Sequence, residues 1–465
     1  MFKKKWDSSE RYNFKRLSVF VGEDESKINF GWYSTEKSTP KIYLSKKEDM
    51  SDAEEYSGSS YDQIDYTNYN PLLFGEKYYT NRVTVKNLQP NTQYYYQRYI
   101  DGVLEDPIPF HTHNDKDFKF VFLGDPQIGG SNHRYSRSNG LNYTSIPDAI
   151  RNDVFNWERT INKAIDFADP SLILSAGDQA DTMLDWNKKD LIGESFINIE
   201  SEYSGFLYPE VMQKIVTATC VGNHEATTSS FDRHFNVPNP LKDAGVRSKY
   251  GDWAPGNNYF FKYNNVLVTV LETNYNNETD YRRIIRRAVK KYPDADWRIA
   301  LFHHDIFGNG STHSQSDAKK IRGVLFNVLS SYNFDLVING HDHVYTSTKF
   351  ISYDYKNATD MNDPDNYKVE NIKINKTNKN PKGTFFVTAN CSTGAKYLDF
   401  LKEPNLDYVF NFTQSFRPTF GVLDFTQSNG KVQMKITTYD VETTDVVDGS
   451  YIFEKDAGSN VDKVY

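Results

Sequence analysis

The sequence predicts an α+β or α/β protein in which an N-terminal β-sandwich, residues 1–114, precedes a mixed α/β domain, residues 115–465. The chain has 465 residues, more than one compact core usually contains. In the first part, Ile28, Phe30 and Trp32 alternate with other residues, a pattern typical of strands with one buried face. In the second part, short apolar strands occur together with a helical pattern, as in domains that combine both elements.

The N-terminal part contains further features of a small sandwich. A strand over Arg82–Lys86 leads through turn-forming residues into a tyrosine-rich run at Tyr94, Tyr95 and Tyr96, which indicates a hairpin or a sandwich corner. The polar stretch Lys46–Asp65 is predicted to be a long surface loop. No catalytic grouping is evident in this part of the sequence, so we expect it to act as a scaffold or to shape the substrate site.

Five apolar strands of the second part share one feature, since each ends in a loop that contains Asp, Asn or His. They are Phe118–Leu123 before Asp125, Leu172–Ala176 before Asp178, Ile215–Val221 before Asn223, Arg298–Phe302 before His303, and Leu336–Ile338 before His341 and His343. Ligands of α/β sheets bind beyond the carboxyl ends of the strands. We therefore expect these side chains to meet at a single sheet edge.

The rest of the second part follows the same pattern of alternating elements. A helix is predicted between the first two strands, because apolar residues from Val154 to Ala168 recur at helical spacing. Strand-like stretches after His343 are expected to supply a second sheet; they are Gly383–Thr388, Thr419–Phe425 and Val432–Thr438. The stretch Tyr355–Asn380 is rich in Asn, Lys and Asp, which predicts an exposed insertion.

The polar residues after these strands form a set of six potential metal ligands: Asp125, Asp178, Asn223, His303, His341 and His343. Carboxylates, an amide oxygen and imidazoles together suit first-row metals better than calcium, which prefers oxygen ligands throughout. Six ligands are more than one tetrahedral ion uses, and they suit two ions that share a bridging carboxylate. Two such ions can hold a phosphoryl group and a bridging hydroxide for in-line attack.

These residues, in this order, resemble the five motifs of calcineurin-like metallophosphoesterases. The motifs are Gly124-Asp125, Gly177-Asp178, Gly222-Asn223-His224-Glu225, His303 and Gly340-His341-Asp342-His343. With its N-terminal β-domain, the chain resembles the purple acid phosphatases among them. That resemblance implies a fibronectin type III-like module followed by a four-layer α/β/β/α sandwich.

The resemblance also implies a role for each residue. Asp178 would bridge two ions, Asp125 and His343 would bind the first ion, and Asn223, His303 and His341 would bind the second. His224 would face the substrate, as a donor to the phosphate or as the acid that protonates the leaving alkoxide, because a histidine can hold a transferable proton near neutral pH.

Three positions depart from the family pattern. Asp181 occupies the place of the tyrosine whose phenolate colours purple acid phosphatases, and Gln127 occupies the place of a histidine found in other branches. We predict that Asp181 or water completes the shell of the first ion and that the protein is not purple. The identities of the two metal ions are left open between iron, zinc and manganese. Asp305 stands where related proteins commonly have proline.

The remaining histidines fall into two groups. His304 follows a proposed ligand at a strand end, so its side chain is expected to point to the opposite side. Its role there is either packing or contact with the substrate. His313 lies in a Gly-Ser-Thr loop where related enzymes often place a substrate-binding histidine, although it would also fit as an ordinary surface residue. No role is predicted for the other four, which are His111, His113, His133 and His234.

The favoured function is hydrolysis of phosphate monoesters, of the acid-phosphatase type, by a hydroxide that bridges the two metal ions. A phosphodiesterase or nucleotide pyrophosphatase on the same centre is the nearest alternative. The motifs do not separate these, because substrate class depends on loops such as Ser131–Pro147 and Glu225–Gly256. A remote alternative is a non-catalytic surface binding protein with a vestigial metal site.

Composition restricts partners and location. A net charge of −8 argues against nucleic acid as a partner, since binding the phosphate backbone needs a basic face. No window of the sequence reaches the roughly 18 apolar residues that a membrane-spanning helix needs. The expected partner is a small phosphate ester, and the oligomeric state is left open. The family resemblance predicts a secreted or extracytoplasmic protein, although the sequence as given shows no signal peptide.

Overall fold

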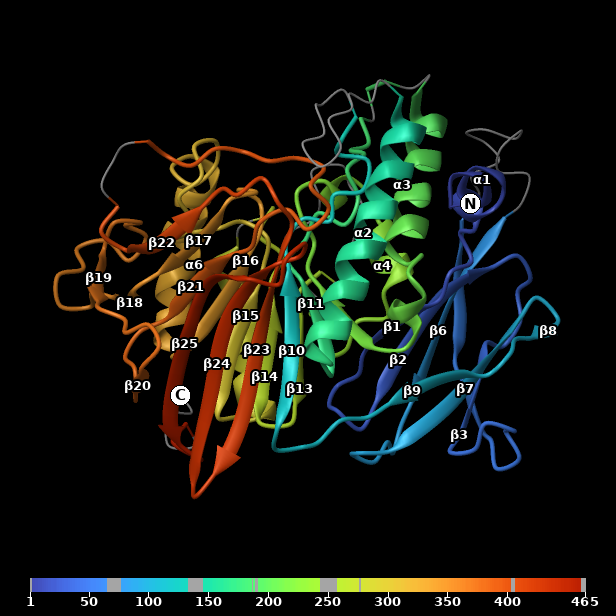
Figure 1. The fold of residues 1–465 in the computed structure, drawn as a ribbon, viewed down its shortest axis with the longest axis horizontal. Coiled ribbons are helices and arrows are strands. Elements are labelled where there is room, and N and C mark those ends of the chain that lie inside the picture. Colours follow the sequence, from blue (N-terminus) through green and yellow to red (C-terminus); the bar gives the residue numbers. More distant parts are fainter. Residues whose placement is uncertain are drawn as a thin grey trace.

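A computed structural model describes residues 2–64, 77–132, 145–185, 187–188, 191–242, 257–275, 277–402 and 406–460. Figure 1 shows the strands of the N-terminal domain, in blue, on one side of the helices α2 and α3, with the remaining sheets on the other side. Residues 133–144 and 243–256, which include His133 and belong to the two loops expected to set substrate class, lie outside the described residues. No helix within the described ranges is both long and apolar enough to cross a membrane.

The N-terminal domain consists of two packed sheets, as predicted. Its elements are α1 (Phe2–Ser8), η1 (Glu10–Tyr12), β1 (Ser18–Val21), β2 (Ile28–Ser34), β3 (Lys41–Ser45), β4 (Glu54–Ser57), β5 (Ser59–Ile64), β6 (Tyr78–Val85), β7 (Gln93–Ile100), β8 (Val103–Leu104) and β9 (Ile108–His111). The strand orders are β1-β2-β6-β5 and β4-β3-β7-β8, with β9 on β7. Phe30, Trp32, Val83 and Tyr96 are among the residues that fill the core between them.

One prediction for this domain is wrong. The stretch Lys46–Asp65 was expected to be a surface loop, but it contains β4 and β5, which pair with β3 and β6. The side chains of β4 are mostly exposed, because this strand lies at the edge of its sheet. An edge strand with solvated side chains has no apolar face, and its sequence therefore resembles that of a polar loop.

The second domain is a sandwich of two sheets with helices outside. The first sheet contains β20 (Thr377–Lys379), β25 (Val446–Asp456), β24 (Lys431–Asp440), β23 (Thr419–Ser428), β10 (Phe118–Leu123), β11 (Leu172–Ser175) and β12 (Val216–Thr219), in this spatial order. The second contains β13 (Tyr259–Tyr263), β14 (Val266–Val270), β15 (Trp297–Leu301), β16 (Leu336–Asn339), β21 (Phe385–Thr388), β17 (Tyr345–Thr348) and β22 (Val409–Thr413).

The helices cover the outer faces of these sheets. Residues of α2 (Ile146–Ala168) and α3 (Ile192–Phe206) share a core with the first sheet, and residues of α5 (Glu278–Lys291) and α6 (Asp317–Ser331) share a core with the second. The shorter elements are η4 (Glu210–Gln213), η5 (Glu225–Thr227), α4 (Ser230–His234), β18 (Phe350–Tyr353) and β19 (Tyr367–Glu370). The predicted α/β/β/α layering is confirmed.

The predicted helix after the first strand is α2, and its ends follow standard capping rules. Ser145 is the N-cap, and its hydroxyl accepts a hydrogen bond from the backbone N–H of Asp148. Asp169, in the left-handed conformation at φ 46°, ends the helix. The buried face includes Val154 and Trp157, so the helical spacing seen in the sequence marks the side that contacts the core.

The five motif strands do not share one sheet, which corrects the expectation of a single edge. β10, β11 and β12 are parallel neighbours in the first sheet, whereas β15 and β16 are parallel neighbours in the second. The three later stretches were expected to supply a second sheet, but β23 pairs with β10 in the first sheet, and of the three only β21 joins the second sheet, beside β16. An apolar run shows that a strand is buried on both faces, but it does not show to which sheet the strand belongs.

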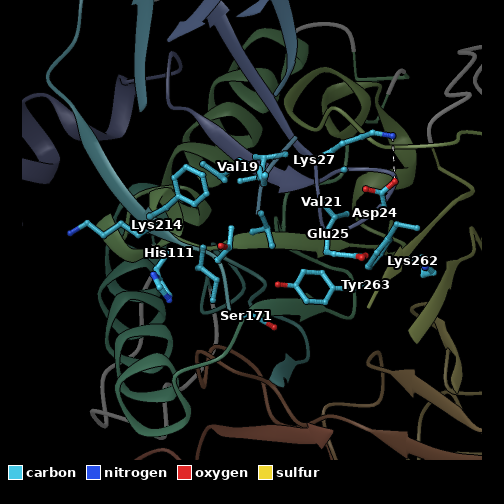
Figure 2. A pocket seen from close by; sticks show the side chains of 18 residues that line it. Val19, Val21, Asp24, Glu25, Lys27, His111, Ser171, Lys214, Lys262 and Tyr263 are labelled. Carbon is cyan, nitrogen blue, oxygen red and sulfur yellow. Dashed lines mark hydrogen bonds and ion pairs between the residues drawn. The ribbon is translucent and has the colours of Figure 1, made fainter. Parts of the chain in front are cut away.

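The first sheet continues into the N-terminal domain. β1 pairs with β12 in parallel, with Phe20 opposite Thr217, so one sheet of eleven strands spans both domains. Figure 2 shows a pocket at this junction, in which Val19 and Val21 of β1 face Ser171 and Tyr263 of the second domain. The pocket lies at the amino ends of β11 and β12, away from the loops that follow these strands.

Candidate metal centre

Three of the five loops after the motif strands share an unusual backbone conformation. Asp125, Asp178, His341 and His343 have φ values of 43°, 48°, 73° and 50°, in the left-handed region that residues with a side chain seldom adopt. Such conformations cost free energy and persist where the surrounding structure fixes them, often at functional sites. Here the conformation turns the side chains away from the strand direction and toward one another.

Two of the motif glycines stand where no larger side chain would fit. A Cβ atom on Gly222 would collide with the carboxylate of Asp178, and one on Gly340 would collide with that of Asp125. A larger residue at either position would displace the carboxylate beside it. Gly222 and Gly340 therefore mark places where the backbone approaches a carboxylate closely.

Five of the six proposed ligands form two groups that share one carboxylate. The ligand atoms of Asp125, Asp178 and His343 lie within 4.8 Å of one another, as do those of Asp178, His303 and His341. All five residues are buried. The amide oxygen of the sixth, Asn223, lies 3.1 Å from Nε2 of His303 and so adjoins the second group. The structure thus brings all six side chains together at one end of the sandwich.

Two histidines are oriented by carbonyl groups outside these clusters. Nδ1 of His303 donates to the carbonyl of Ala176 over 2.9 Å, and Nδ1 of His343 donates to the carbonyl of Lys396 over 2.6 Å. Nε2 of His303 then lies 3.3 Å from Asp178, and Nε2 of His343 lies 3.4 Å from Asp125. Because one nitrogen is occupied by an acceptor, the other is available as a ligand, an arrangement typical of metal-binding histidines.

His341 has the reverse orientation. Its Nδ1 lies 3.0 Å from Nε2 of His303, and its Nε2 lies 3.2 Å from a carboxylate oxygen of Asp317. Its backbone N–H donates to both carboxylate oxygens of Asp125 over 3.0 Å. The donor set as a whole, with two carboxylates, one amide oxygen and three imidazoles, fits iron, zinc or manganese and does not choose among them.

Burial governs the electrostatics of the cluster. Burial raises the pKa of Asp125 to about 7, and it lowers the pKa of His341 to about 4. For His303 burial opposes the charged form, but the nearby Asp178 and Asp125 carboxylates outweigh it and raise the pKa to about 10. Buried carboxylates need compensating positive charge, and bound cations can supply it.

His224 lies beside this cluster, partly exposed. Its Nε2 is 3.8 Å from a carboxylate oxygen of Asp178, and its backbone N–H donates to the other oxygen over 3.1 Å. Nδ1 donates to the carbonyl of Asp181, and Nε2 lies 2.9 Å from Nε2 of Gln127. Burial opposes protonation, but the Asp178 and Asp181 carboxylates outweigh it and raise the pKa of His224. The ring therefore has a fixed orientation next to the shared carboxylate.

The structure places His313 and His304 near the second group. The ring of His313 lies against that of His341, with centroids 3.9 Å apart. His304 was expected to point to the opposite side from His303, and this is wrong, because its ring lies 4.5 Å from that of His341. β15 ends at Leu301, so the alternation of side chains in a strand no longer applies at these positions. Nδ1 of His304 is 2.7 Å from the hydroxyl of Thr273.

Asp181 is placed differently from the proposed ligands. One carboxylate oxygen lies 3.7 Å from Nδ1 of His224. Among the described residues, Asp181 belongs to none of the groups whose ligand atoms lie within 4.8 Å of one another. Its backbone N–H donates to the buried carboxylate of Glu202 over 3.2 Å. The structure thus places the carboxylate of Asp181 beside His224.

Two further residues of the site carried no predicted role. The buried carboxylate of Glu225 accepts hydrogen bonds from the backbone N–H groups of Asp178, Ala180 and Gly222 over 3.1, 2.9 and 2.7 Å. Asp317 contacts His341, as described above, from the first position of α6. Glu225 belongs to one of the five motifs, and that membership is a signal for it in the sequence. Asp317 stands four residues after His313, a spacing that brings side chains together only where a helix turn is present.

Comparisons with known proteins agree with this fold. The calcineurin-like phosphoesterase family model matches residues 118–345, and the model of the purple acid phosphatase N-terminal domain matches residues 15–112. A search of curated proteins gave no match. Among solved structures, the chain is similar to the purple acid phosphatase PPD1 from yellow lupin (Lupinus luteus) seeds, with a TM-score of 0.62 and 15% identity over 95% of this chain and 74% of that one.

A second similar structure is that of PhoD, with a TM-score of 0.50 and 10% identity over 97% of each chain. At such identities these likenesses show the fold alone. The two family matches together cover nearly all of residues 15–345, in the order in which the two domains occur. The chain therefore belongs to the calcineurin-like phosphoesterases, in the form that begins with a purple acid phosphatase N-terminal domain, and it is a metal-dependent phosphoesterase.

Proposed function

We propose that this protein hydrolyses phosphate monoesters at a pair of metal ions held by the six converging side chains. The observation that carries this proposal is the sharing of Asp178 between two groups of ligand atoms. Asp125 and His343 complete the first group, and His303 and His341, with the adjoining Asn223, complete the second. A carboxylate common to two such groups suits a bridging ligand between two cations.

When bound, such a pair of cations lowers the pKa of water toward neutrality and neutralises charge on the phosphoryl group. The residues of the chain supply the remaining functions. The three ligand histidines each donate one N–H to an acceptor outside the pair of groups, which holds their other nitrogens in place. The buried carboxylates create a local demand for cations in a chain whose net charge is −8.

His224 and His313 are the proposed substrate-facing residues. Both are partly exposed, with 14% and 25% of their side chains accessible, whereas the ligand histidines are buried. His224 lies beside Asp178, so a phosphate bound at the cations would meet its imidazole. We assign His224 the role of donating a hydrogen bond to the phosphate or a proton to the leaving oxygen. His313 would contact the phosphate from the side of the second group.

The test compares hydrolysis of nitrophenyl phosphate with that of bis-nitrophenyl phosphate, together with elemental analysis of the purified protein. The expected results are two metal ions per chain and a higher kcat/KM for the monoester. Asp178→Asn should lose metal and activity together, whereas Glu210→Gln, which changes an exposed carboxylate, should change neither. A higher kcat/KM for the diester would show that the protein is a phosphodiesterase. Absence of turnover of either ester by metal-replete protein would contradict both functions.

A further inference from the structure

A carboxylate that the six proposed ligands do not include lies among three histidines. One oxygen of Asp317 is 3.2 Å from Nε2 of His341 and 3.5 Å from Nδ1 of His313. The ligand atoms of Asp317, His304 and His341 also lie within 4.8 Å of one another. His341 is buried, whereas 45% of the Asp317 side chain is exposed. Asp317 therefore approaches the metal centre from its outer side.

The contact with Asp317 decides which nitrogen of His341 carries the proton. An aspartate that water reaches and that faces two imidazoles is ionised at neutral pH. An ionised carboxylate only accepts hydrogen bonds, so the nitrogen that faces it must be the donor. Nε2 of His341 thus carries the proton, and the lone pair is on Nδ1.

Nδ1 is also the nitrogen that faces the second group of ligand atoms, at 3.0 Å from Nε2 of His303. The other tautomer would present an N–H group to that site and could not act as a ligand there. A carboxylate that accepts a hydrogen bond from the non-coordinating nitrogen of a metal-binding histidine fixes the tautomer of the ring and makes the coordinating nitrogen more basic. The same Asp317 oxygen also holds His313, whose ring lies against that of His341.

We propose that Asp317 is a positioning residue that selects the metal-binding tautomer of His341 and holds His313 against its ring. The inference rests on the ligand role proposed for His341 and extends it to a residue of another element. Asp317 does not contact the proposed cations, and its effect passes through the two imidazoles.

Asp317 could instead stabilise its helix or bind a metal ion itself, and these two roles predict different results. As the first residue of α6, its carboxylate would stabilise the helix through the helix dipole. Glu278 has the equivalent position in α5, where it pairs with Arg282 and is remote in sequence from the motifs, so it serves as the matched control. In the second role, Asp317, His304 and His341 would hold a third cation, and Nε2 of His341 would be a ligand that carries no proton.

The experiment compares Asp317→Ala, Asp317→Asn and Glu278→Ala in the full chain. The first measurement is the nitrogen-15 NMR spectrum of the histidine rings in metal-free protein, which distinguishes the tautomers. The second is a calorimetric titration with Zn²⁺ or Mn²⁺. Asp317→Ala should give a mixture of His341 tautomers and weaken the second binding step about 10- to 100-fold, with the first step unchanged. Asp317→Asn should restore part of the loss, because its amide oxygen still accepts from Nε2.

Each outcome bears on a distinct claim. If Asp317→Ala binds the second ion within twofold of wild type and His341 keeps its proton on Nε2, the inference is wrong. An equal loss in Glu278→Ala would reduce the effect to helix stability, and loss of a third equivalent of metal would favour the third cation site. If wild-type protein binds fewer than two ions, the proposed function itself fails, and the role of Asp317 with it.

Discussion

Among single residues, Gln127 best shows what a departure from the family pattern does. It is fully buried at φ 36°, and its backbone N–H donates to the carbonyl of Asp178 over 2.7 Å. The nitrogen of its side-chain amide lies 2.9 Å from Nε2 of His224. Where other branches place a histidine, this chain thus has an amide N–H group that donates to the imidazole of His224.

The acid role proposed for His224 leads to a prediction that depends on the leaving group. His224→Ala should lower kcat on an alkyl phosphate by about 100-fold or more, since general acids contribute factors of this order. The loss on nitrophenyl phosphate should be much smaller, because nitrophenolate leaves without being protonated. Equal losses on both substrates, at unchanged metal content, would show that His224 does not act as an acid.

A second prediction concerns Asp181 and is spectroscopic. The chain has this aspartate where the tyrosine of purple acid phosphatases stands, and its carboxylate lies beside His224. Protein loaded with iron should therefore show no tyrosinate-to-iron absorption band in the visible range. The band would be sought in iron-loaded wild type and in apoprotein, and its appearance would mean that another tyrosine reaches the metal.

The six proposed ligands could be found from the sequence because each stands directly after an apolar strand in a short motif. Asp317 could not be found in this way. Its partner His341 is 24 residues away in the sequence, and the contact depends on how α6 packs against the loop after β16. A lone aspartate at a helix start is common in proteins, so the sequence alone gives it no special meaning.

At the scale of elements, Glu225 joins two of the motif loops. Its carboxylate accepts N–H groups from the loop after β11, at Asp178 and Ala180, and from the loop after β12, at Gly222. The pairing of β11 with β12 ends at Ser175 and Thr219, before both loops begin. Together with the backbone N–H of His224, which donates to Asp178, this side chain fixes the position of the shared carboxylate.

The corresponding prediction is that Glu225→Gln lowers stability by about 1–3 kcal/mol, because the glutamine amide leaves a buried backbone donor without an acceptor. Metal affinity should fall as well, since Asp178 moves with its loop. The matched variant Glu202→Gln changes a buried carboxylate that accepts from Asp181 and Thr182, so it should lower stability but spare metal affinity. Urea unfolding and metal titration of both variants would check this prediction. Equal metal affinities of Glu225→Gln and Glu202→Gln would contradict it.

The sequence predicted the elements better than their assembly. β10 has the predicted bounds, and β16 extends one residue beyond its predicted end. The sheet to which each strand belongs was not predictable, because β23 and β11 are both apolar although one is antiparallel and the other parallel to β10. The hydrophobic pattern of a strand shows which of its residues are buried, whereas the strands it pairs with depend on contacts between distant segments.

At the scale of the whole molecule, the two domains are joined more closely than their separate sequence patterns suggest. The pairing of β1 with β12 makes one sheet of both, and aromatic residues pack across the junction. Phe20 of β1 lies 5.3 Å from Phe235, and Tyr33 of β2 lies 4.5 Å from the ring of His234, measured between ring centroids. His234, for which the sequence predicted no role, thus packs at this interface.

This continuity predicts that the two domains unfold together. Phe20 is fully buried, and its replacement by alanine should cost about 3–5 kcal/mol, the usual range for a core phenylalanine. If the sheet is one cooperative unit, calorimetry of the full chain should show a single transition that shifts as a whole in Phe20→Ala. Val103→Ala, at a largely exposed position of the same domain, should leave it unshifted. Two transitions, of which only one responds to Phe20→Ala, would mean that the N-terminal domain folds independently. In that case the sheet pairing would not couple its stability to that of the metal-bearing sandwich.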